Sequence, residues 1–190
     1  MNWILASGSP RRRELLEMLG VPDLTIRPAK GPERATPGAG PEQTVRELSL
    51  HKAQEVAQTC APEDIIIAAD TIVYLDGAIL GKPRDHDDAV RMLTALSGRE
   101  HIVYTGVAVL RGGELRQAAE RTAGRFRPLT SGEIERYIAT GEPMDKAGAY
   151  GIQGRGALFV AHLDGDYFNV MGLPLCRLGQ LLNELGVELL

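Results

Sequence analysis

A run of serines and arginines near the start of the chain, Ser7–Arg13 (SGSPRRR), has residue types that bind phosphate. A strand is expected over residues 3–6, and Ser9 fits a helix N-cap with Pro10 at the first helical position. Such a helix begins with unpaired backbone N–H groups, to which the arginines add fork-shaped donors. The run therefore predicts a polyanion site. A capped helix whose basic first turn only faces solvent explains the same residues.

A single carboxylate interrupts an apolar run farther along the chain. Asp70 follows Ile65–Ala69 (IIIAA) and precedes Thr71–Val73 (TIV). A carboxylate in a buried strand is costly unless it is paired, bound to a metal or used in catalysis. We interpret Asp70 as a functional carboxylate, with a structural ion pair or a bend at a strand end as the alternative.

Two lysines occupy positions that suit anion binding. Steps of three and four residues place Lys52 on the same helix face as Val45, Leu48 and Val56. A lysine on an inward face either extends to the protein surface or reaches an anion. Lys82 follows an expected tight turn, and taken alone it is more simply explained as a surface lysine.

A glycine-dense segment, residues 145–156 (DKAGAYGIQGRG), carries polar side chains between its glycines. Glycines allow the backbone to approach a ligand closely, although a bulged strand or a loop without a ligand explains them equally well. Gln153 is the residue best equipped to read a base edge, because its amide has one acceptor and two donors.

Strands and helices alternate along the chain. The periodicity predicts a short strand over 24–28, a mobile lid-like loop over 31–41, helices over 42–60, 85–97, 131–140 and 173–188, strands over 64–75 and 101–110, a strand from 113 to about 127, and extended segments between 145 and 170. Turns at 76–77 and 112–113 require antiparallel pairs, so the sheet is expected to be mixed. The acidic run at 85–88 fits a helix N-terminus capped by Asp85 better than a metal site.

The composition limits the classes of function. The chain has 190 residues, a formal net charge of −4 and two cysteines. This length suits one domain, 1–190, with one core or two lobes, and the acidic balance argues against a general nucleic-acid-binding protein. Two cysteines are too few for a disulfide framework or a zinc site, and no stretch approaches the roughly 18 apolar residues of a membrane span. We expect a cytoplasmic protein with no nucleic-acid or membrane partner.

Short motifs in a fixed order resemble those of the Maf family of nucleoside triphosphate pyrophosphatases over nearly the whole chain. They are Ala6–Arg12 (ASGSPRR), Lys52–Ala53, Ala69–Val73 (ADTIV), Gly81–Pro83 (GKP), Leu96–Gly98, Thr105–Val107, Asp145–Gly154 and Asn169–Pro174. The resemblance implies an α/β fold related to inosine triphosphate pyrophosphatase, in which a mixed sheet with flanking helices forms two lobes around a central cleft. It also implies cleavage between the α and β phosphates with a divalent cation, and it suggests a homodimer.

The resemblance further implies roles for particular residues. Arg12, Thr71 and Gln153 match the set of the branch that acts on dTTP and UTP, whereas another branch acts on methylated GTP. We expect the triphosphate to be bound by Ser7, Ser9, Arg11, Lys52 and Lys82. Mg²⁺ or Mn²⁺ would be held by Asp70, with Glu33 as a second ligand, and Asp70 would act as general base. Gln153 and Thr71 can pair with the O4 and N3–H edge that uracil and thymine share.

Two other functions fit the same residues. The family has been linked with septum formation, so the chain could be a nucleotide-binding regulator of cell division without turnover. Alternatively, the physiological substrates are modified pyrimidine nucleotides. The enzyme would then hydrolyse them before they are incorporated, and dTTP and UTP would only be similar molecules that it also accepts. Pyrophosphate release from dTTP would separate the enzyme from the regulator.

Overall fold

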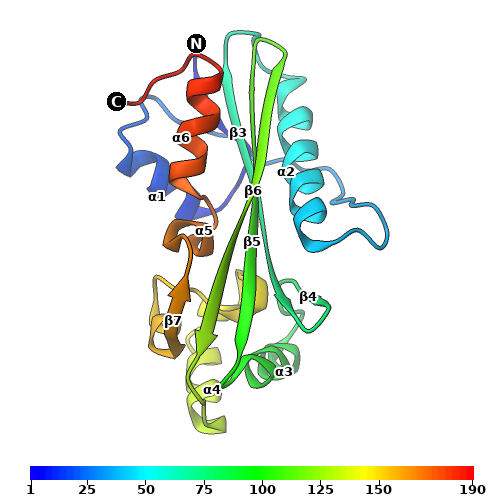
Figure 1. The fold of residues 1–190 in the computed structure, drawn as a ribbon, viewed down its shortest axis with the longest axis vertical. Coiled ribbons are helices and arrows are strands. Elements are labelled where there is room, and N and C mark those ends of the chain that lie inside the picture. Colours follow the sequence, from blue (N-terminus) through cyan, green and yellow to red (C-terminus); the bar gives the residue numbers. More distant parts are fainter. The chain divides into compact units, whose positions relative to one another are not determined.

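A computed structural model describes residues 1–190. In chain order its helices and strands are β1 (Trp3–Leu5), α1 (Pro10–Met18), β2 (Thr25–Ile26), α2 (Pro41–Ala57), β3 (Ile65–Leu75), β4 (Ala78–Leu80), α3 (His86–Leu96), β5 (Glu100–Arg111), β6 (Glu114–Phe126), α4 (Ser131–Ile138), β7 (Val160–Asp164), α5 (Tyr167–Met171) and α6 (Leu175–Glu184) (Figure 1). Three short 3₁₀ helices lie between α4 and β7.

The strands form one seven-stranded sheet in the order β2-β1-β3-β5-β6-β7, with β4 paired to β3. β1 pairs in parallel with β2 and β3, whereas β3 pairs antiparallel with β4 and β6 pairs antiparallel with β7. The prediction of a mixed α/β sheet is therefore confirmed.

The chain divides into two compact units. Unit 1 comprises Met1–Asp70, Thr105–Glu120 and Gly172–Leu190, and unit 2 comprises Thr71–Tyr104 and Arg121–Met171. The division falls within β3, directly after Asp70. Each unit has its own hydrophobic core.

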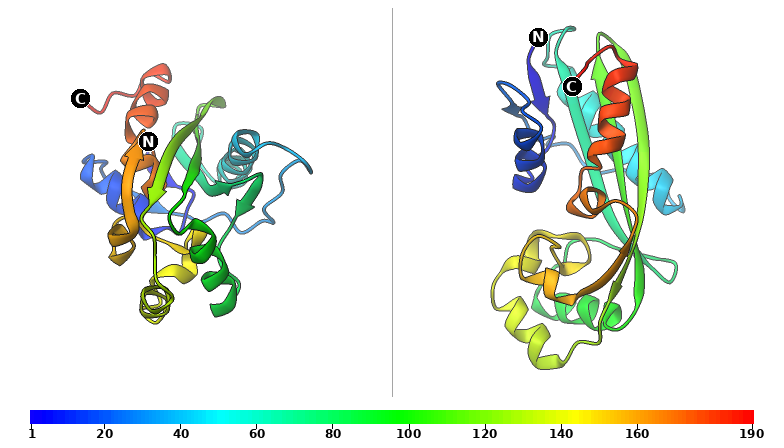
Figure 2. Two further views of the ribbon diagram at one scale, coloured as in Figure 1. Left: turned by 60° about the horizontal axis from the view of Figure 1, so that its bottom comes forward. Right: turned by 60° about the vertical axis from the view of Figure 1, so that its left-hand side comes forward.

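Small side chains let α2 pack tightly in unit 1. One of its core clusters consists of Ile4, Ala6, Ala53, Val56, Ile66, Ala68 and Ala108. At Gly106 in β5, an added Cβ would lie 2.1 Å from the backbone oxygen of Val45 in α2, so only glycine permits this approach. Within unit 1, α2 lies on one side of the strands and α1 and α6 lie on the other (Figures 1 and 2).

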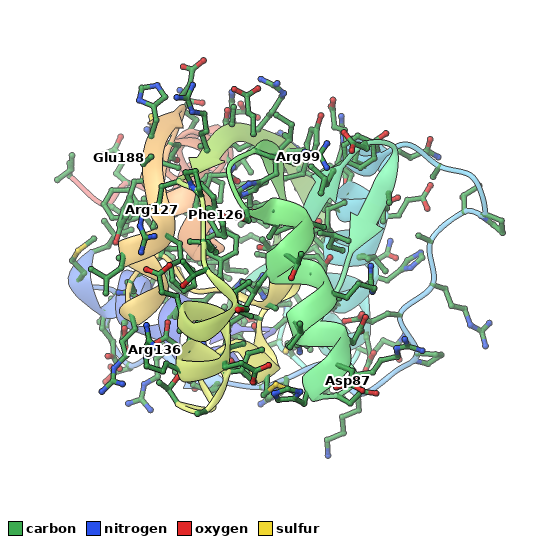
Figure 3. The ribbon with its side chains drawn as sticks, turned by 90° about the horizontal axis from the view of Figure 1, so that it is seen from below. Asp87, Arg99, Phe126, Arg127, Arg136 and Glu188 are labelled. Carbon is green, nitrogen blue, oxygen red and sulfur yellow. The ribbon has the colours of Figure 1, made fainter.

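Unit 2 is built on aromatic and aliphatic packing around α3 and α4. Asp85 caps α3, because its Oδ1 accepts a hydrogen bond from the Asp88 N–H at 2.8 Å, as the sequence predicted. Asp87 lies in the first turn of α3 and its side chain is exposed (Figure 3). Phe126, from β6, belongs to the core of this unit. α4 begins with a capping box between Thr130 and Glu133.

The segment 145–170 differs from the prediction of extended structure. It contains the end of one 3₁₀ helix, two further 3₁₀ helices, the strand β7 and the helix α5. Gly148 and Ala149 have φ values of 69° and 60°, which turn the chain and interrupt any strand. The expected strand over 24–28 is shortened to Thr25–Ile26, and α2 and α6 end earlier than predicted, at Ala57 and Glu184.

Candidate functional site

The start of α1 is built as the sequence predicted, but a different serine makes the local bonds. Ser9 is the N-cap residue with an extended backbone, and Pro10 follows at the first helical position. The Ser9 side chain makes no capping bond. Instead, the buried hydroxyl of Ser7 accepts hydrogen bonds from the Ser9 N–H at 3.2 Å and from Nη1 of Arg12 at 3.0 Å. Ser7 therefore links the turn before α1 to Arg12 in the first turn of that helix.

Arg12 has a fixed side chain and a strong electrostatic environment. Its Nε donates to the backbone oxygen of Gly172 at 2.7 Å. Burial lowers the pKa of the guanidinium from 12.5 to about 10, and the charge of Arg11 adds to this, whereas the carboxylates of Asp70 and Glu33 oppose it. At neutral pH Arg12 is therefore still charged. The arginines and the carboxylates influence one another electrostatically within unit 1.

We call Glu33, Lys52 and Asp70 the lysine–carboxylate cluster. Nζ of Lys52 lies 2.5 Å from Oδ1 of Asp70 and 2.7 Å from Oε1 of Glu33. The side chains of Lys52 and Asp70 are only 18% and 11% exposed, whereas that of Glu33 is 63% exposed. Lys52 therefore reaches two carboxylates of the chain itself, and its binding of a ligand anion stays a prediction. The ion pair considered for Asp70 is also present, and the low exposure makes it a costly one to bury.

The loop that carries Glu33 is held on α2 by two carboxylates. Glu55 accepts a hydrogen bond from the backbone N–H of Gly31 at 2.9 Å, and Glu47 accepts one from the backbone N–H of Thr36 at 2.7 Å. Both bonds are exposed to solvent. The loop expected to act as a lid is therefore attached at two points on either side of Glu33.

In unit 2, two of the predicted ligand-binding side chains, those of Lys82 and Gln153, are not engaged in bonds of this kind. Lys82 and Gln153 are exposed, and neither side chain makes a hydrogen bond or ion pair within the chain. Thr71 follows Asp70 directly in β3 and is partly buried. Lys82 and Gln153 are therefore available to a ligand without breaking an existing bond.

The glycines around Gln153 are explained by packing inside unit 2. An added Cβ at Gly154 would lie 2.4 Å from Oε2 of Glu142, and one at Gly156 would lie 2.5 Å from the backbone oxygen of Gly151. Of the two explanations for this segment, close packing within the chain accounts for these two glycines without a ligand.

The structure groups the predicted site residues by unit. Unit 1 contains Ser7, Ser9, Arg11, Arg12, Glu33, Lys52 and Asp70, and unit 2 contains Thr71, Lys82 and Gln153. Two residues of unit 2 that the sequence analysis did not single out, Tyr137 and Glu142, bond to the loop that carries Gln153. The glycines of this loop were the only sequence signal for their approach.

The carboxylates of the lysine–carboxylate cluster have the chemistry that Mg²⁺ or Mn²⁺ requires. These hard cations take oxygen ligands, and Mg²⁺ is commonly held by one or two carboxylates together with phosphate oxygens of a substrate. Asp70 and Glu33 share one ammonium group, so two carboxylate oxygens lie near one point. No group of three or more His, Cys, Asp or Glu residues that could hold a metal is present. The residues fit a cation that completes its ligands with phosphate oxygens.

The fold places the chain in a class of mixed α/β proteins. It is similar to the solved structure of a HAM1 protein from Coxiella burnetii, with a TM-score of 0.55 and 16% identity over 97% of this chain and 99% of that one. This likeness concerns the fold. A family model described as "Maf-like protein" matches residues 2–185, and the chain belongs to the Maf family. None of its helices is long and apolar enough to cross a membrane.

Relatives in this family carry a specific name. A protein of Moorella thermoacetica named dTTP/UTP pyrophosphatase is 52% identical to this chain, over 97% of the chain and 95% of the relative. Proteins with the same name from Bacillus cytotoxicus and Chromobacterium violaceum are each 50% identical, over 93% and 97% of the chain and 92% and 95% of the relatives.

Proposed function

We propose that the protein is a nucleoside triphosphate pyrophosphatase that hydrolyses dTTP and UTP to the nucleoside monophosphate and pyrophosphate. The observation that carries this proposal is the lysine–carboxylate cluster, in which a nearly buried aspartate on β3 meets a lysine from α2. A buried carboxylate is expensive to maintain, and functional sites are where such costs are commonly found. The relatives named dTTP/UTP pyrophosphatase, about half identical over nearly the full chain, supply the reaction and the nucleotides.

The reaction requires charge neutralisation more than unusual side chains. A water oxygen forms a bond to phosphorus, the bond from phosphorus to the oxygen bridging the α and β phosphates breaks, and pyrophosphate leaves. Asp70 accepts the proton of the attacking water as general base. Cations stabilise the charge of the triphosphate, and we assign this role to Arg11, Lys52 and Lys82, with hydrogen bonds from Ser7 and Ser9.

We assign a divalent cation, Mg²⁺ or Mn²⁺, to Asp70 and Glu33. When bound, the cation neutralises phosphate charge. Lys52 pairs with both carboxylates, which holds their oxygens close together before a nucleotide binds. Removal of divalent cations with a chelator is expected to abolish turnover, and adding Mg²⁺ or Mn²⁺ to restore it.

Base selectivity is assigned to Arg12, Thr71 and Gln153. Gln153 is the strongest of these assignments, because its exposed amide makes no bond within the chain and can pair with O4 and N3–H of uracil or thymine. Arg12 is held by the Gly172 carbonyl and by Ser7.

We also propose a homodimer in the cytoplasm, where the two free cysteines would remain reduced.

The test is pyrophosphate release from a panel of nucleoside triphosphates with Mg²⁺ or Mn²⁺. The proposal predicts turnover of dTTP and UTP, with pyrophosphate rather than single phosphates as product. Binding of these nucleotides without turnover would contradict it and would favour the regulatory function. A panel that includes C5-modified pyrimidine nucleotides would show whether these are better substrates.

A further inference from the structure

Glu142 lies at the centre of a set of hydrogen bonds that hold the loop Gly151–Gly156. Its Oε2 accepts the backbone N–H of Arg155 at 2.9 Å, and its Oε1 accepts the backbone N–H of Gly156 at 3.1 Å. One carboxylate therefore binds the backbone N–H groups of two consecutive residues, the second and third after Gln153. Hydrogen bonds from N–H groups to a carboxylate are stronger than those to a neutral acceptor.

Tyr137 connects the other end of the loop to the same carboxylate. Its hydroxyl donates to Oε1 of Glu142 at 2.8 Å and accepts the backbone N–H of Gly151 at 3.1 Å. Tyr137 is 4% exposed, and its ring packs edge-on against Phe159 at a centroid distance of 4.9 Å. Both ends of the loop are thus tied to Glu142, one end directly and the other through Tyr137.

The loop sequence and the charge of Glu142 agree with this arrangement. Glycine at position 154 leaves the space that the carboxylate occupies, since a Cβ there would lie 2.4 Å from Oε2. Burial raises the pKa of Glu142, but the hydrogen bonds from Arg155, Gly156 and Tyr137 outweigh it and leave the pKa below its ordinary value. Glu142 is therefore ionised at neutral pH, as a strong acceptor should be.

We propose that Glu142 and Tyr137 are positioning residues that set base selectivity by fixing the backbone of the loop that carries Gln153. This inference rests on the proposed function and on the assignment of Gln153 as the base-reading residue. A glutamine amide carries both a donor and an acceptor, so it can adapt to more than one base edge if it moves. Its selectivity therefore depends on where the backbone holds it.

The test compares Glu142→Ala and Tyr137→Phe with the wild type. We expect the ratio of kcat/KM for UTP to that for CTP to fall about tenfold in both variants, as for the loss of one well-placed hydrogen bond. A ratio is insensitive to partial unfolding, because unfolded protein lowers both activities equally. Tyr137→Phe keeps the ring and its packing, so this variant is expected to fold.

A second measurement does not depend on turnover. Amide hydrogen exchange should accelerate at Arg155 and Gly156 in Glu142→Ala, and at Gly151 in Tyr137→Phe, while amides of the unit 2 core keep their protection. The matched control is Glu133→Ala. Glu133 is another unit 2 carboxylate, which accepts the backbone N–H of Thr130 at 2.9 Å, and its loss should leave the UTP/CTP ratio unchanged.

The possible results separate the two proposals. Faster loop exchange with an unchanged UTP/CTP ratio would overturn the positioning role, and unchanged exchange would overturn the attachment itself. An equal fall of the UTP/CTP ratio in Glu133→Ala would also overturn the positioning role, because the effect would then not be specific to the loop. A wild type without turnover, or without preference for UTP, would instead overturn the proposed function, and the selectivity role with it.

Discussion

The lysine–carboxylate cluster of unit 1 and the loop Gly151–Gly156 of unit 2 hold their functional side chains in opposite ways. In the cluster, Lys52 and Asp70 are fixed by bonds to each other. In the loop, the bonds run from the backbone to neighbouring side chains, and the Gln153 side chain makes none. Substitution in the cluster therefore disturbs several partners at once, whereas substitution of Gln153 removes only what it offers to a ligand.

This difference predicts which variants change stability as well as activity. Residues of the cluster are coupled, so pairs of substitutions should be non-additive. Gln153 should be separable from the fold.

The largest loss is expected for Asp70→Asn. Removing a general base commonly lowers the rate by about 10²–10⁴-fold. The variant should stay folded, since Lys52 retains Glu33 as a partner. The measurement is kcat for dTTP, with circular dichroism as a check of folding. The control is Asp76→Asn, which removes an exposed carboxylate in the turn after β3. The backbone of Asp76 has a φ of 49°, which asparagine adopts as readily as aspartate, so the turn should be kept. Normal turnover by Asp70→Asn would contradict the assignment of the base.

Lys52→Met should lower both activity and stability. It leaves Asp70 buried without its ammonium partner, and breaking a buried pair in this way costs about 3 kcal/mol of unfolding free energy. The measurement is urea unfolding of each single variant and of Lys52→Met combined with Asp70→Asn. The double variant should be more stable than the Lys52→Met variant alone. Strict additivity of the two effects would show that the pair is not energetically coupled.

The pH dependence of stability tests the attachment of the loop in unit 2. His101 is 2% exposed, and its Nε2 lies 2.7 Å from the hydroxyl of Tyr150, the residue before the loop. Burial lowers the pKa of His101 from 6.5 to about 4. Between pH 4 and pH 6.5, His101 is protonated more readily in the unfolded chain than in the folded one. The contribution of the neutral, buried His101 to the free energy of unfolding is therefore fully present above pH 6.5 and is lost as the pH falls toward 4.

This loss should reach about 3 kcal/mol at pH 4. It is measured by urea unfolding at several pH values, and His101→Phe should flatten the profile below pH 6.5 after its constant cost is subtracted. A variant profile parallel to that of the wild type would mean that His101 does not carry this dependence.

The smallest effect on the fold is expected for Gln153→Ala. The melting temperature should stay within about 1 °C of the wild-type value, because exposed substitutions away from packed features change stability little. The kcat/KM for UTP should fall about tenfold relative to that for CTP, the loss of one hydrogen bond to the base. A marked fall in melting temperature would show that Gln153 also supports the fold.

Sequence reasoning succeeded where the signal was local or anomalous. Asp85 was identified as a cap because short polar residues before a helix satisfy its first N–H groups. Lys52 and Asp70 stood out because each places a charge among apolar neighbours, and the structure joins them. What the sequence did not reveal is that the partner of each was the other, since the contact spans 18 positions between a helix and a strand.

The unpredicted parts depend on contacts that leave no periodic pattern. The 3₁₀ helix Ala147–Ala149 includes left-handed backbone at Gly148 and Ala149, and alanine gives no warning of a positive φ. The role of Glu142 depends on two backbone N–H groups 13 and 14 positions away. Glycine at 154 indicated a close approach there, but not whether a ligand or a carboxylate makes it.

The most direct test of the account measures one nucleotide panel with three proteins: the wild type, Asp70→Asn and Gln153→Ala. We expect the wild type to release pyrophosphate from dTTP and UTP. We also expect Asp70→Asn to lower the turnover of every accepted nucleotide by a similar factor, and Gln153→Ala to change the preference among bases. A wild type without pyrophosphate release, or an Asp70→Asn variant that turns over normally, would contradict the account.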